Sequence, residues 1–151
     1  MIRARSPSAS LRAGSHPAEM HRIFRDDCEY FMEKRIRFVK HEGQLIMLID
    51  LSHCTPAEIM PLADEIQRRV AEHPLNSLLT LADFTGVQID KVAAMRIKEV
   101  LTLDRPYVKR SAWVGTESLP HVFYENFKSF SQRDLPTFKT REDAMDWLVK
   151  E

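Results

Sequence analysis

Glycine is scarce in this chain, which has four glycines among 151 residues. Loops that cradle a nucleotide, such as Gly-x-Gly-x-x-Gly or the P-loop, need several glycines close together, because only glycine lets the backbone approach a phosphate so closely. Neither loop is present, and the Gly-x-Ser-x-Gly elbow of the α/β-hydrolases is missing as well. These absences disfavour an enzyme that uses a nucleotide cofactor, and no cofactor is predicted.

Cysteine is also rare, since Cys28 and Cys54 are the only two and form no Cys-x-x-Cys pair. This usage argues against a disulfide framework and favours a reducing, cytoplasmic location. The six histidines show no spacing typical of metal ligands, so no metal site is predicted. No apolar run approaches the ~18 residues that a membrane span needs, and the longest, Leu45 to Ile49, suits a strand.

The chain has no excess of charge of either sign, because its 22 Lys and Arg residues balance 22 Asp and Glu residues. Nucleic-acid binding requires a concentrated basic face, so nucleic acid is not predicted as a partner. Hydrophobic residues make up 44% and charged residues 29%, which is typical of a globular protein. A chain of this length can bury a stable core without metal or disulfide crosslinks.

The amino-terminal part has a different composition. Residues 1–18 contain three arginines and four serines but no acidic residue. This composition is compatible with an organelle transit peptide, although a poorly packed leader is the favoured interpretation. We therefore expect a leader at 1–30, poorly packed or forming an extra helix, followed by one folded domain at 31–151.

Five segments have the apolar pattern of strands, namely 35–41, 44–50, 77–82, 108–114 and 136–138. The first two are joined by Glu42-Gly43, which predicts an antiparallel hairpin. The second is apolar on both faces, as expected for a strand in the middle of a sheet. The last contains Pro136, which cannot donate to a central ladder, so this strand is predicted at an edge.

Helices are predicted after the last four strands, each from apolar residues at helical spacing behind a capping residue. The predicted caps are Thr55, Asp90, Ser118 and Thr140. Pro61 is expected to kink the first of these helices or to mark its true start. The order β-β-α-β-α-β-α-β-α predicts an α/β fold, with a mostly parallel sheet of four to five strands and an antiparallel first strand.

Several short motifs lie along the chain in a distinctive order. The first is the strand QLIMLIDLS, and the second is a buried strand that runs into Asp83-Phe84-Thr85-Gly86-Val87 before Asp90. Arg105-Pro106-Tyr107-Val108-Lys109 then enters a strand ending Ala112-Trp113-Val114-Gly115, and Phe138-x-Thr140-x-x-x-Ala144-x-x-Trp147-Leu148 closes the chain. Together these motifs resemble the SpoIIAA-like family, a STAS/SEC14-like domain, over about Arg35 to Glu151.

The resemblance implies a STAS fold, as in the bacterial anti-sigma factor antagonists, and a small cytoplasmic protein without enzymatic activity of its own. In the antagonists, a serine directly after the second aspartate of the motif is phosphorylated by a partner kinase. Here Lys91 follows Asp90, and the segment between Asp83 and Asp90 is one residue shorter. That switch is therefore not carried over, and Thr85 occupies a different place in the motif.

The loop from Asp83 to Asp90 is the predicted functional surface. Open α/β sheets bind ligands outside the carboxyl ends of their strands, and the start of a helix can hold an anion. The predicted binding residues are Asp83, Phe84, Thr85, Gly86, Asp90 and Lys91. The structural alternative is that Asp83 caps a turn, Gly86 adopts a positive φ, Asp90 caps the helix and Lys91 is solvated.

A phenylalanine-rich helix is predicted after Ser118. Its expected inward face carries Leu119, Val122, Phe123, Phe127 and Phe130, and Tyr124 beside that face is expected to reach solvent. Core packing against the sheet is the favoured interpretation. In a SEC14-like protein such a helix would line an apolar or lipid pocket, and Phe123, Tyr124 and Phe127 are the predicted lining residues.

The sequence leaves three functions open. The first is a non-catalytic regulatory or protein-interaction module that uses the loop Asp83 to Asp90 and the helix after it, with a partner protein or a second copy of the chain. The second is a carrier or sensor of a small apolar or anionic ligand held between the phenylalanine-rich helix and the sheet. The third is a small enzyme, which requires a cleft that collects Asp83, a histidine and a nucleophile.

Overall fold

The computed structural model describes residues 29–150 of the chain. The leader predicted at 1–30 lies almost wholly outside these residues, and so does Cys28. Residues 29–35 are helical, and the fold that carries the candidate site belongs to the unit Lys34–Glu151.

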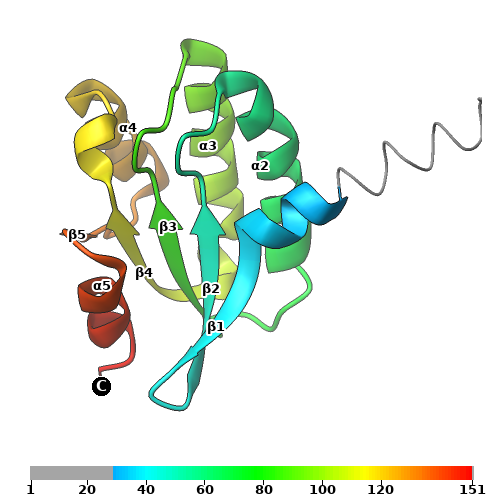
Figure 1. The fold of residues 1–151 in the computed structure, drawn as a ribbon, viewed down its shortest axis with the longest axis vertical. Helices are drawn as coiled ribbons and strands as arrows, with labels where there is room; N and C mark the ends of the chain where they lie inside the picture. Colours follow the sequence, from blue (N-terminus) through cyan, green and yellow to red (C-terminus); the bar gives the residue numbers. More distant parts are fainter. Residues whose placement is uncertain (1–28, 151) are drawn as a thin grey trace, which may run out of the picture. The chain divides into compact units, whose positions relative to one another are not determined.

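Five strands form one sheet in which the spatial order follows the chain, β1-β2-β3-β4-β5 (Figure 1). The strands are β1 (Ile36–His41), β2 (Gln44–Asp50), β3 (Leu78–Asp83), β4 (Val108–Val114) and β5 (Thr137–Phe138). β1 pairs antiparallel with β2, and every later strand pairs parallel with the strand before it. The predicted α/β class, the mostly parallel sheet and the edge position of the last strand are confirmed, whereas the STAS topology stays a prediction.

Four helices follow β2, β3, β4 and β5 in turn: α2 (Pro56–Val70), α3 (Lys91–Asp104), α4 (His121–Ser131) and α5 (Arg141–Leu148). α3 packs between α2 and α4, and these three helices cover one face of the sheet (Figure 1). α5 packs on β3, β4 and β5 from the opposite face. The sheet therefore has helices on both faces, with a single short helix on one of them.

Alternate residues of each strand supply the two layers of the core, because successive side chains of a strand point to opposite faces. The layer under α5 consists of Ile46, Leu48, Leu79, Leu81, Ala112, Val114, Ala144 and Leu148. On the opposite face, the ring of Trp113 lies 4.5 Å from the ring of Phe84 and 6.0 Å from that of Phe127, between centroids. Trp113 thus joins the end of β3 to α4.

Three of the predicted helix caps are confirmed. Thr55 and Glu58 form a reciprocal capping box at the start of α2. Asp90 accepts a hydrogen bond from an N–H of the first turn of α3, and Thr140 does the same for α5. Pro61 lies inside α2 on its exposed side, and the helix runs through it without ending.

The prediction that Ser118 caps the next helix is wrong. Ser118 belongs to a short 3-10 turn, Thr116–Ser118, and α4 begins only at His121, after Pro120. The buried face of α4 passes through Phe127 and Ser131. Val122 and Phe130, expected on the inward face, are exposed.

Tyr124 also departs from its predicted position in solvent. The side chain is partly buried, and its hydroxyl donates a hydrogen bond of 2.8 Å to the carbonyl of Leu135. α4 is therefore anchored at its middle by a polar contact as well as by the packing of Phe127.

Candidate functional site

The parallel strands end in one row across the sheet. Asp50 of β2 pairs in register with Asp83 of β3, and Asp83 pairs in register with Val114 of β4. Residues in register point to the same face of a sheet. The carboxylates of Asp50 and Asp83 consequently lie side by side at the carboxyl edge, on the face that carries α5.

Each aspartate begins a turn of the same design. Asp50 Oδ1 accepts hydrogen bonds from the Ser52 N–H (3.0 Å) and the Ser52 hydroxyl (2.5 Å). Asp83 Oδ1 accepts from the Thr85 N–H (2.9 Å) and the Thr85 hydroxyl (2.7 Å). Both segments are Asx turns, and we call Asp50–Ser52 the first Asp turn and Asp83–Thr85 the second Asp turn.

Backbone hydrogen bonds join the two Asp turns to each other. The Leu51 N–H donates to the Asp83 carbonyl (2.9 Å), and the His53 N–H donates to the Thr85 carbonyl (2.8 Å). The Phe84 N–H donates in the same way to the Val114 carbonyl at 2.9 Å. The ladder of the sheet thus continues past the strand ends, and this gives the loops a support that is unusual for surface segments.

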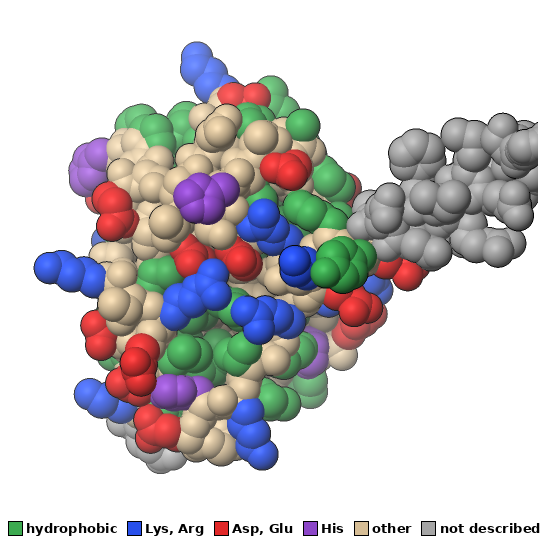
Figure 2. Space-filling model, in the orientation of Figure 1, with side chains coloured by type: hydrophobic (Ala, Val, Ile, Leu, Met, Phe, Trp, Pro, Cys, Tyr) green, Lys and Arg blue, Asp and Glu red, His purple; other side chains and the backbone are tan. Residues whose placement is uncertain are grey.

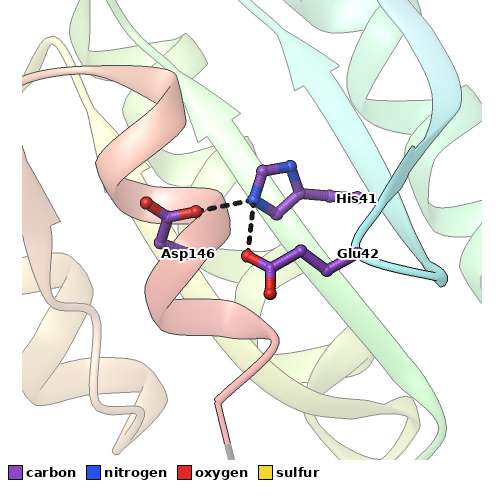
Figure 3. Close-up of side chains that lie close together, drawn as sticks. All are labelled: His41, Glu42 and Asp146. Atoms are coloured by element: carbon purple, nitrogen blue, oxygen red, sulfur yellow. Dashed lines mark hydrogen bonds and ion pairs between the residues drawn. The ribbon is translucent and has the colours of Figure 1, made fainter.

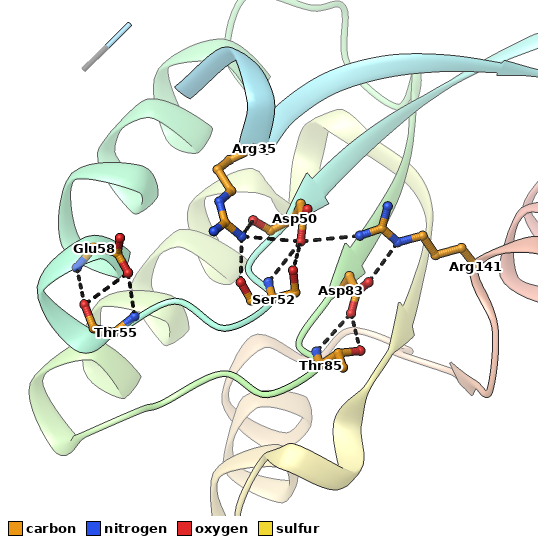
Figure 4. A network of polar contacts seen from close by, with 8 residues as sticks. All are labelled: Arg35, Asp50, Ser52, Thr55, Glu58, Asp83, Thr85 and Arg141. Atoms are coloured by element: carbon orange, nitrogen blue, oxygen red, sulfur yellow. Dashed lines mark hydrogen bonds and ion pairs between the residues drawn. The ribbon is translucent and has the colours of Figure 1, made fainter. Parts of the chain in front are cut away.

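Two arginines bind the aspartates from opposite sides (Figure 4). Arg141, the first residue of α5, places Nε 2.8 Å from Asp83 Oδ2 and Nη2 3.4 Å from Asp50 Oδ1. Arg35 donates to the carbonyls of Asp50 (3.2 Å) and Ser52 (2.6 Å), and its Nη1 lies 3.5 Å from Asp50 Oδ1. We call Arg35, Asp50, Asp83 and Arg141 the aspartate–arginine network.

The network is electrically balanced, with two acids and two guanidinium groups. Burial by itself would raise the pKa of Asp50, but hydrogen bonds from Ser52 and the charges of Arg141 and Arg35 outweigh burial, so this pKa lies below its usual value. Figure 2 shows the same pattern at the surface, with a small group of acidic side chains between basic ones on the face that carries α5. Oδ1 of Asp50 and both carboxylate oxygens of Asp83 are occupied by contacts within the network.

The structure divides the predicted binding residues between the interior and the surface. Asp83 and Phe84 are buried. Thr85, Asp90 and Lys91 are exposed, and Gly86 is partly exposed. The surface of the predicted loop is therefore formed by Thr85, Gly86 and the residues from Gln88 to Asp90, and the buried Asp83 and Phe84 hold that surface in place.

Gly86 is required by its conformation and by its neighbours. It has a φ of 67°, and a Cβ at this position would collide with the ring of His53. Its N–H donates a 2.7 Å hydrogen bond to the hydroxyl of Ser118. Ser118, which was predicted to cap a helix, thus accepts a hydrogen bond from this loop instead.

His53 and Cys54 are the residues near the second Asp turn that an enzyme could use, but neither has the contacts that catalysis would need. Within residues 29–150, no hydrogen bond joins the ring of His53 to a hydroxyl or a carboxylate. Cys54 is fully buried, and burial raises the pKa of its thiol to about 11. A thiol of this kind is almost entirely protonated near neutral pH and is a poor nucleophile.

The three residues predicted to line a pocket pack together around Trp113. Phe127 is fully buried, and its ring stacks on that of Phe123 at 6.4 Å between centroids. The ring of Tyr124 lies edge-on to Trp113 at 5.9 Å. A pocket of about 60 Å³ lies between the sheet and helices α2 and α3, and none of the three contributes to its wall, whereas Tyr124 lines a separate surface hollow of about 600 Å³.

A second polar group was not predicted from the sequence. His41 Nε2 lies 2.7 Å from Asp146 Oδ1 and 3.5 Å from Glu42 Oε2 (Figure 3), and one possible ligand atom from each residue falls within 4.8 Å of the others. These residue types can bind a cation, but both acidic groups are at least half exposed. The contact that the structure shows is a hydrogen bond between His41, at the end of β1, and Asp146 of α5.

Sequence reasoning found only one of the four residues of the aspartate–arginine network. Asp83 was predicted, whereas Asp50, Arg35 and Arg141 were not. One signal was present, because Asp50-Leu51-Ser52 and Asp83-Phe84-Thr85 repeat the pattern Asp-x-Ser/Thr after two strands. The arginine partners had no local signal, since Arg141 lies 58 positions from Asp83.

Comparison with protein-family models, with curated proteins and with solved structures finds no match to this chain. No helix among the described residues has the length and apolar character needed to cross a membrane.

Proposed function

We propose that the chain is a non-catalytic binding module of the SpoIIAA-like kind, which engages a partner protein through the exposed residues of the loop Asp83 to Asp90 and the outer face of α3. The observation that carries the proposal is that large apolar side chains are exposed on the outer face of α3. Val92 is 61% exposed and Met95 67% exposed in the first turns of the helix, directly after the loop. Leu103 extends the apolar stripe toward the end of α3.

The composition of this surface supports a protein partner. Apolar side chains that are exposed in the monomer and lie next to polar ones are typical of the centre of a protein–protein interface, and methionine is enriched there. Lys91 and Lys98 flank the stripe, and Lys98 Nζ lies 4.7 Å from the centre of the Phe130 ring. Asp90 and Glu99 are exposed beside the same stripe, so the partner surface is expected to be apolar at its centre and of mixed charge at its rim.

The aspartate–arginine network gives this surface its rigidity. It fixes the two Asp turns, and the second Asp turn leads into the loop before α3. A loop held in its bound conformation loses less entropy on binding than a mobile loop. The network therefore supports recognition without contacting the partner directly.

The proposal is tested by photo-crosslinking in living cells of the source organism. A photo-reactive amino acid replaces Met95, and in a matched control it replaces Arg68, which is exposed on the neighbouring helix α2. We expect one defined protein adduct from position 95 and none from position 68. The substitution Val92→Lys, combined with the probe at 95, is expected to abolish the adduct.

Two outcomes would overturn the proposal. Equal labelling from positions 95 and 68 would show that the α3 face has no special affinity for proteins. An adduct with the mass of two copies of this chain would show that the α3 face binds a second copy of the chain and not a partner protein.

A further inference from the structure

A surface hollow of about 390 Å³ lies at the amino-terminal end of β4, on the opposite edge of the sheet from the aspartate–arginine network. Its walls come from the turn after α3, the first residues of β4, the segment after α4 and Trp147 of α5. Its cationic side chains are Arg105, Lys109, Arg110 and Arg133, and Asp134 is the single acid among the described residues that line it. We call this surface the basic hollow.

The arginines of the basic hollow differ from most others in the described part of the chain. Between residues 29 and 150, the arginines that form an ion pair with a carboxylate are Arg35, Arg68, Arg69, Arg96 and Arg141. In the same range, no carboxylate lies within ion-pair distance of the four cations of the basic hollow. Positive charges gathered without a counter-charge repel one another, so an anion bound among them lowers their energy.

Arg110 is held in place by uncharged groups. Its guanidinium lies 4.0 Å from the centre of the Trp147 ring, and it donates hydrogen bonds to the carbonyls of Leu148 (3.3 Å) and Lys150. An aromatic ring and two carbonyls fix the position of a guanidinium but have no formal charge to neutralise it. The positive charge of Arg110 therefore remains available to a ligand.

Arg133 lies on the inner side of the basic hollow. Its Nη1 donates to the Leu101 carbonyl at 3.2 Å, and its Nη2 donates to the hydroxyl of the buried Ser111. Asp104 is the nearby acid, but no hydrogen bond or ion pair joins it to Arg133 within residues 29–150. Burial lowers the pKa of Arg133 to about 10, so the side chain is still cationic near neutral pH.

We infer that the basic hollow binds a small molecule through a phosphate monoester group. Such a group has about two negative charges and three acceptor oxygens at neutral pH, whereas a carboxylate has one charge and two oxygens. Lys109 is exposed and has no partner among residues 29–150, and the exposed Arg105 contacts only the Gln132 side chain, at 3.5 Å. The dianion therefore matches the separate cations of the basic hollow better than a carboxylate does. This site is distinct from the α3 surface, and the inference goes beyond partner binding.

The size and the surroundings of the basic hollow favour a small molecule over a membrane or a nucleic acid. Its volume of about 390 Å³ is within the range of small-molecule sites. Binding to a lipid surface uses exposed apolar side chains beside the basic ones, but none of the large apolar side chains exposed among residues 29–150 lines the hollow. A nucleic acid follows a basic surface over several phosphates, and the chain as a whole has no net charge to attract a polyanion.

The test uses the full-length protein and glycerol 3-phosphate in isothermal titration calorimetry at pH 8, where the phosphate monoester is a dianion. The hydroxyls of this probe can also donate to Asp134 at the wall of the hollow. We expect saturable binding of one molecule, and none of glycerol, which lacks the phosphate group. Glycerate has a similar shape but one negative charge, so it should bind about tenfold more weakly. Added salt should weaken the binding, because ions screen exposed charges.

Two double variants with the same change of charge locate the bound phosphate. Arg105→Gln with Lys109→Gln removes two exposed cations that form no ion pair in the described structure, so this variant should fold like the wild type. It is expected to raise the dissociation constant about thirtyfold, through the loss of two charged contacts to the phosphate. Arg37→Gln with Lys40→Gln removes two exposed cations from β1 instead, and should leave the dissociation constant within about twofold of wild type.

Three results would overturn the inference. Wild-type protein that does not bind glycerol 3-phosphate would show that the basic hollow is no phosphate site. Equal loss of affinity in the two double variants would show that the charge of the whole chain, and not the hollow, attracts the phosphate. Binding to phosphatidylserine vesicles or to a single-stranded oligonucleotide that exceeds the binding of glycerol 3-phosphate, and that only the variant of residues 105 and 109 loses, would assign the hollow to a membrane or to a nucleic acid.

Discussion

Asp83 and Asp104 are buried to the same extent, each 6% exposed, but they differ in the hydrogen bonds that they accept. Asp83 accepts three hydrogen bonds, two from Thr85 and one from Arg141. Asp104 accepts none from any residue that the structure describes, and burial raises its pKa to about 7. Burial alone therefore does not decide the state of a carboxyl group in this fold.

The difference comes from where each aspartate sits. Asp83 ends a strand, where the backbone of the next turn bends back to donate to it and where α5 brings an arginine. Asp104 ends a helix, where the carbonyls nearby are acceptors and where the side chain is buried near the charges of Arg133 and Arg96 without a hydrogen bond to either. The first position favours a carboxylate that stabilises structure, and the second favours a carboxyl group that responds to pH.

The largest expected effect is the pH dependence that Asp104 adds to stability. The unfolded carboxyl titrates near pH 4 and the folded one near 7, so between these values folding takes up a proton and stability falls as the pH rises. The loss amounts to at most about 4 kcal/mol and is complete above pH 7. Urea unfolding of wild type and Asp104→Asn at several pH values measures it, with Glu117→Gln as an exposed control.

A difference in unfolding free energy between wild type and Asp104→Asn that does not change across this pH range would contradict the comparison, because Asp104 would then behave like an exposed acid.

Asp50 is expected to show the opposite pH dependence. Its pKa lies below the usual value, so its contribution to stability is present above that value and is lost in acid.

Gly115 is expected to have the next largest effect, because it holds the second Asp turn against β4. It has a φ of 72°, and a Cβ there would collide with the backbone nitrogen and the side chain of Thr85. Gly115→Ala should cost about 3 kcal/mol of unfolding free energy, from the strained φ and the displaced turn together. Gly43→Ala shares a positive φ of 82° but meets open space, so a cost of about 1 kcal/mol is expected for it.

Equal costs for the two glycine variants would contradict the close packing of Gly115 on Thr85. Thermal unfolding followed by circular dichroism is sufficient to distinguish them.

Asp83→Asn tests the satisfied aspartate directly. The amide keeps the shape, but it replaces a charged acceptor and faces Arg141 with no negative charge. We expect a loss of about 2 kcal/mol at pH 8, reduced from the value for a fully buried pair because Arg141 is one-third exposed. At the same pH, Asp104→Asn should be neutral or stabilising, and a result in which both variants destabilise equally would remove the distinction between the two sites.

The smallest effect is expected from the hydroxyl of the second Asp turn. Thr85→Val removes one of the hydrogen bonds to Asp83 and leaves the backbone bond in place, so the cost should be about 1 kcal/mol. Thr102→Val is the matched control, because Thr102 is exposed on α3 and donates only to a carbonyl of its own helix. Urea unfolding with equal midpoints for both variants would show that the Thr85 hydroxyl contributes nothing to the turn.

Local patterns predicted most of the fold. The caps at Thr55, Asp90 and Thr140 depend on residues three positions away, so their hydrogen bonds can be read from the chain itself. Ser118 failed as a predicted cap because Pro120 sets the backbone after it and α4 begins later. Val122 and Phe130 are exposed although their spacing suits a buried face, because α4 packs through Phe127 and Ser131 instead.

A residue of the candidate sites could be predicted from the sequence only where it directly follows a recognisable strand. Asp83 was identified because a buried strand leads straight into it. Its neighbour Asp50 becomes part of the site through strand register, and Arg141 through the docking of α5. The basic hollow had no sequence signal, since its walls combine residues of the turn after α3, β4, the segment after α4 and α5.

The order of the sheet has a consequence for how the protein assembles. Every strand pairs with the strand made just before it, so no strand has to be inserted between two that are already paired. Such sequential pairing closes short loops first and is associated with rapid folding. Assembly can follow synthesis from β1 onward. Once β2 and β3 are paired, Asp50 and Asp83 are neighbouring charges of like sign. Arg141 lies in α5, after all five strands, so its charge reaches the two aspartates later than the strands that carry them.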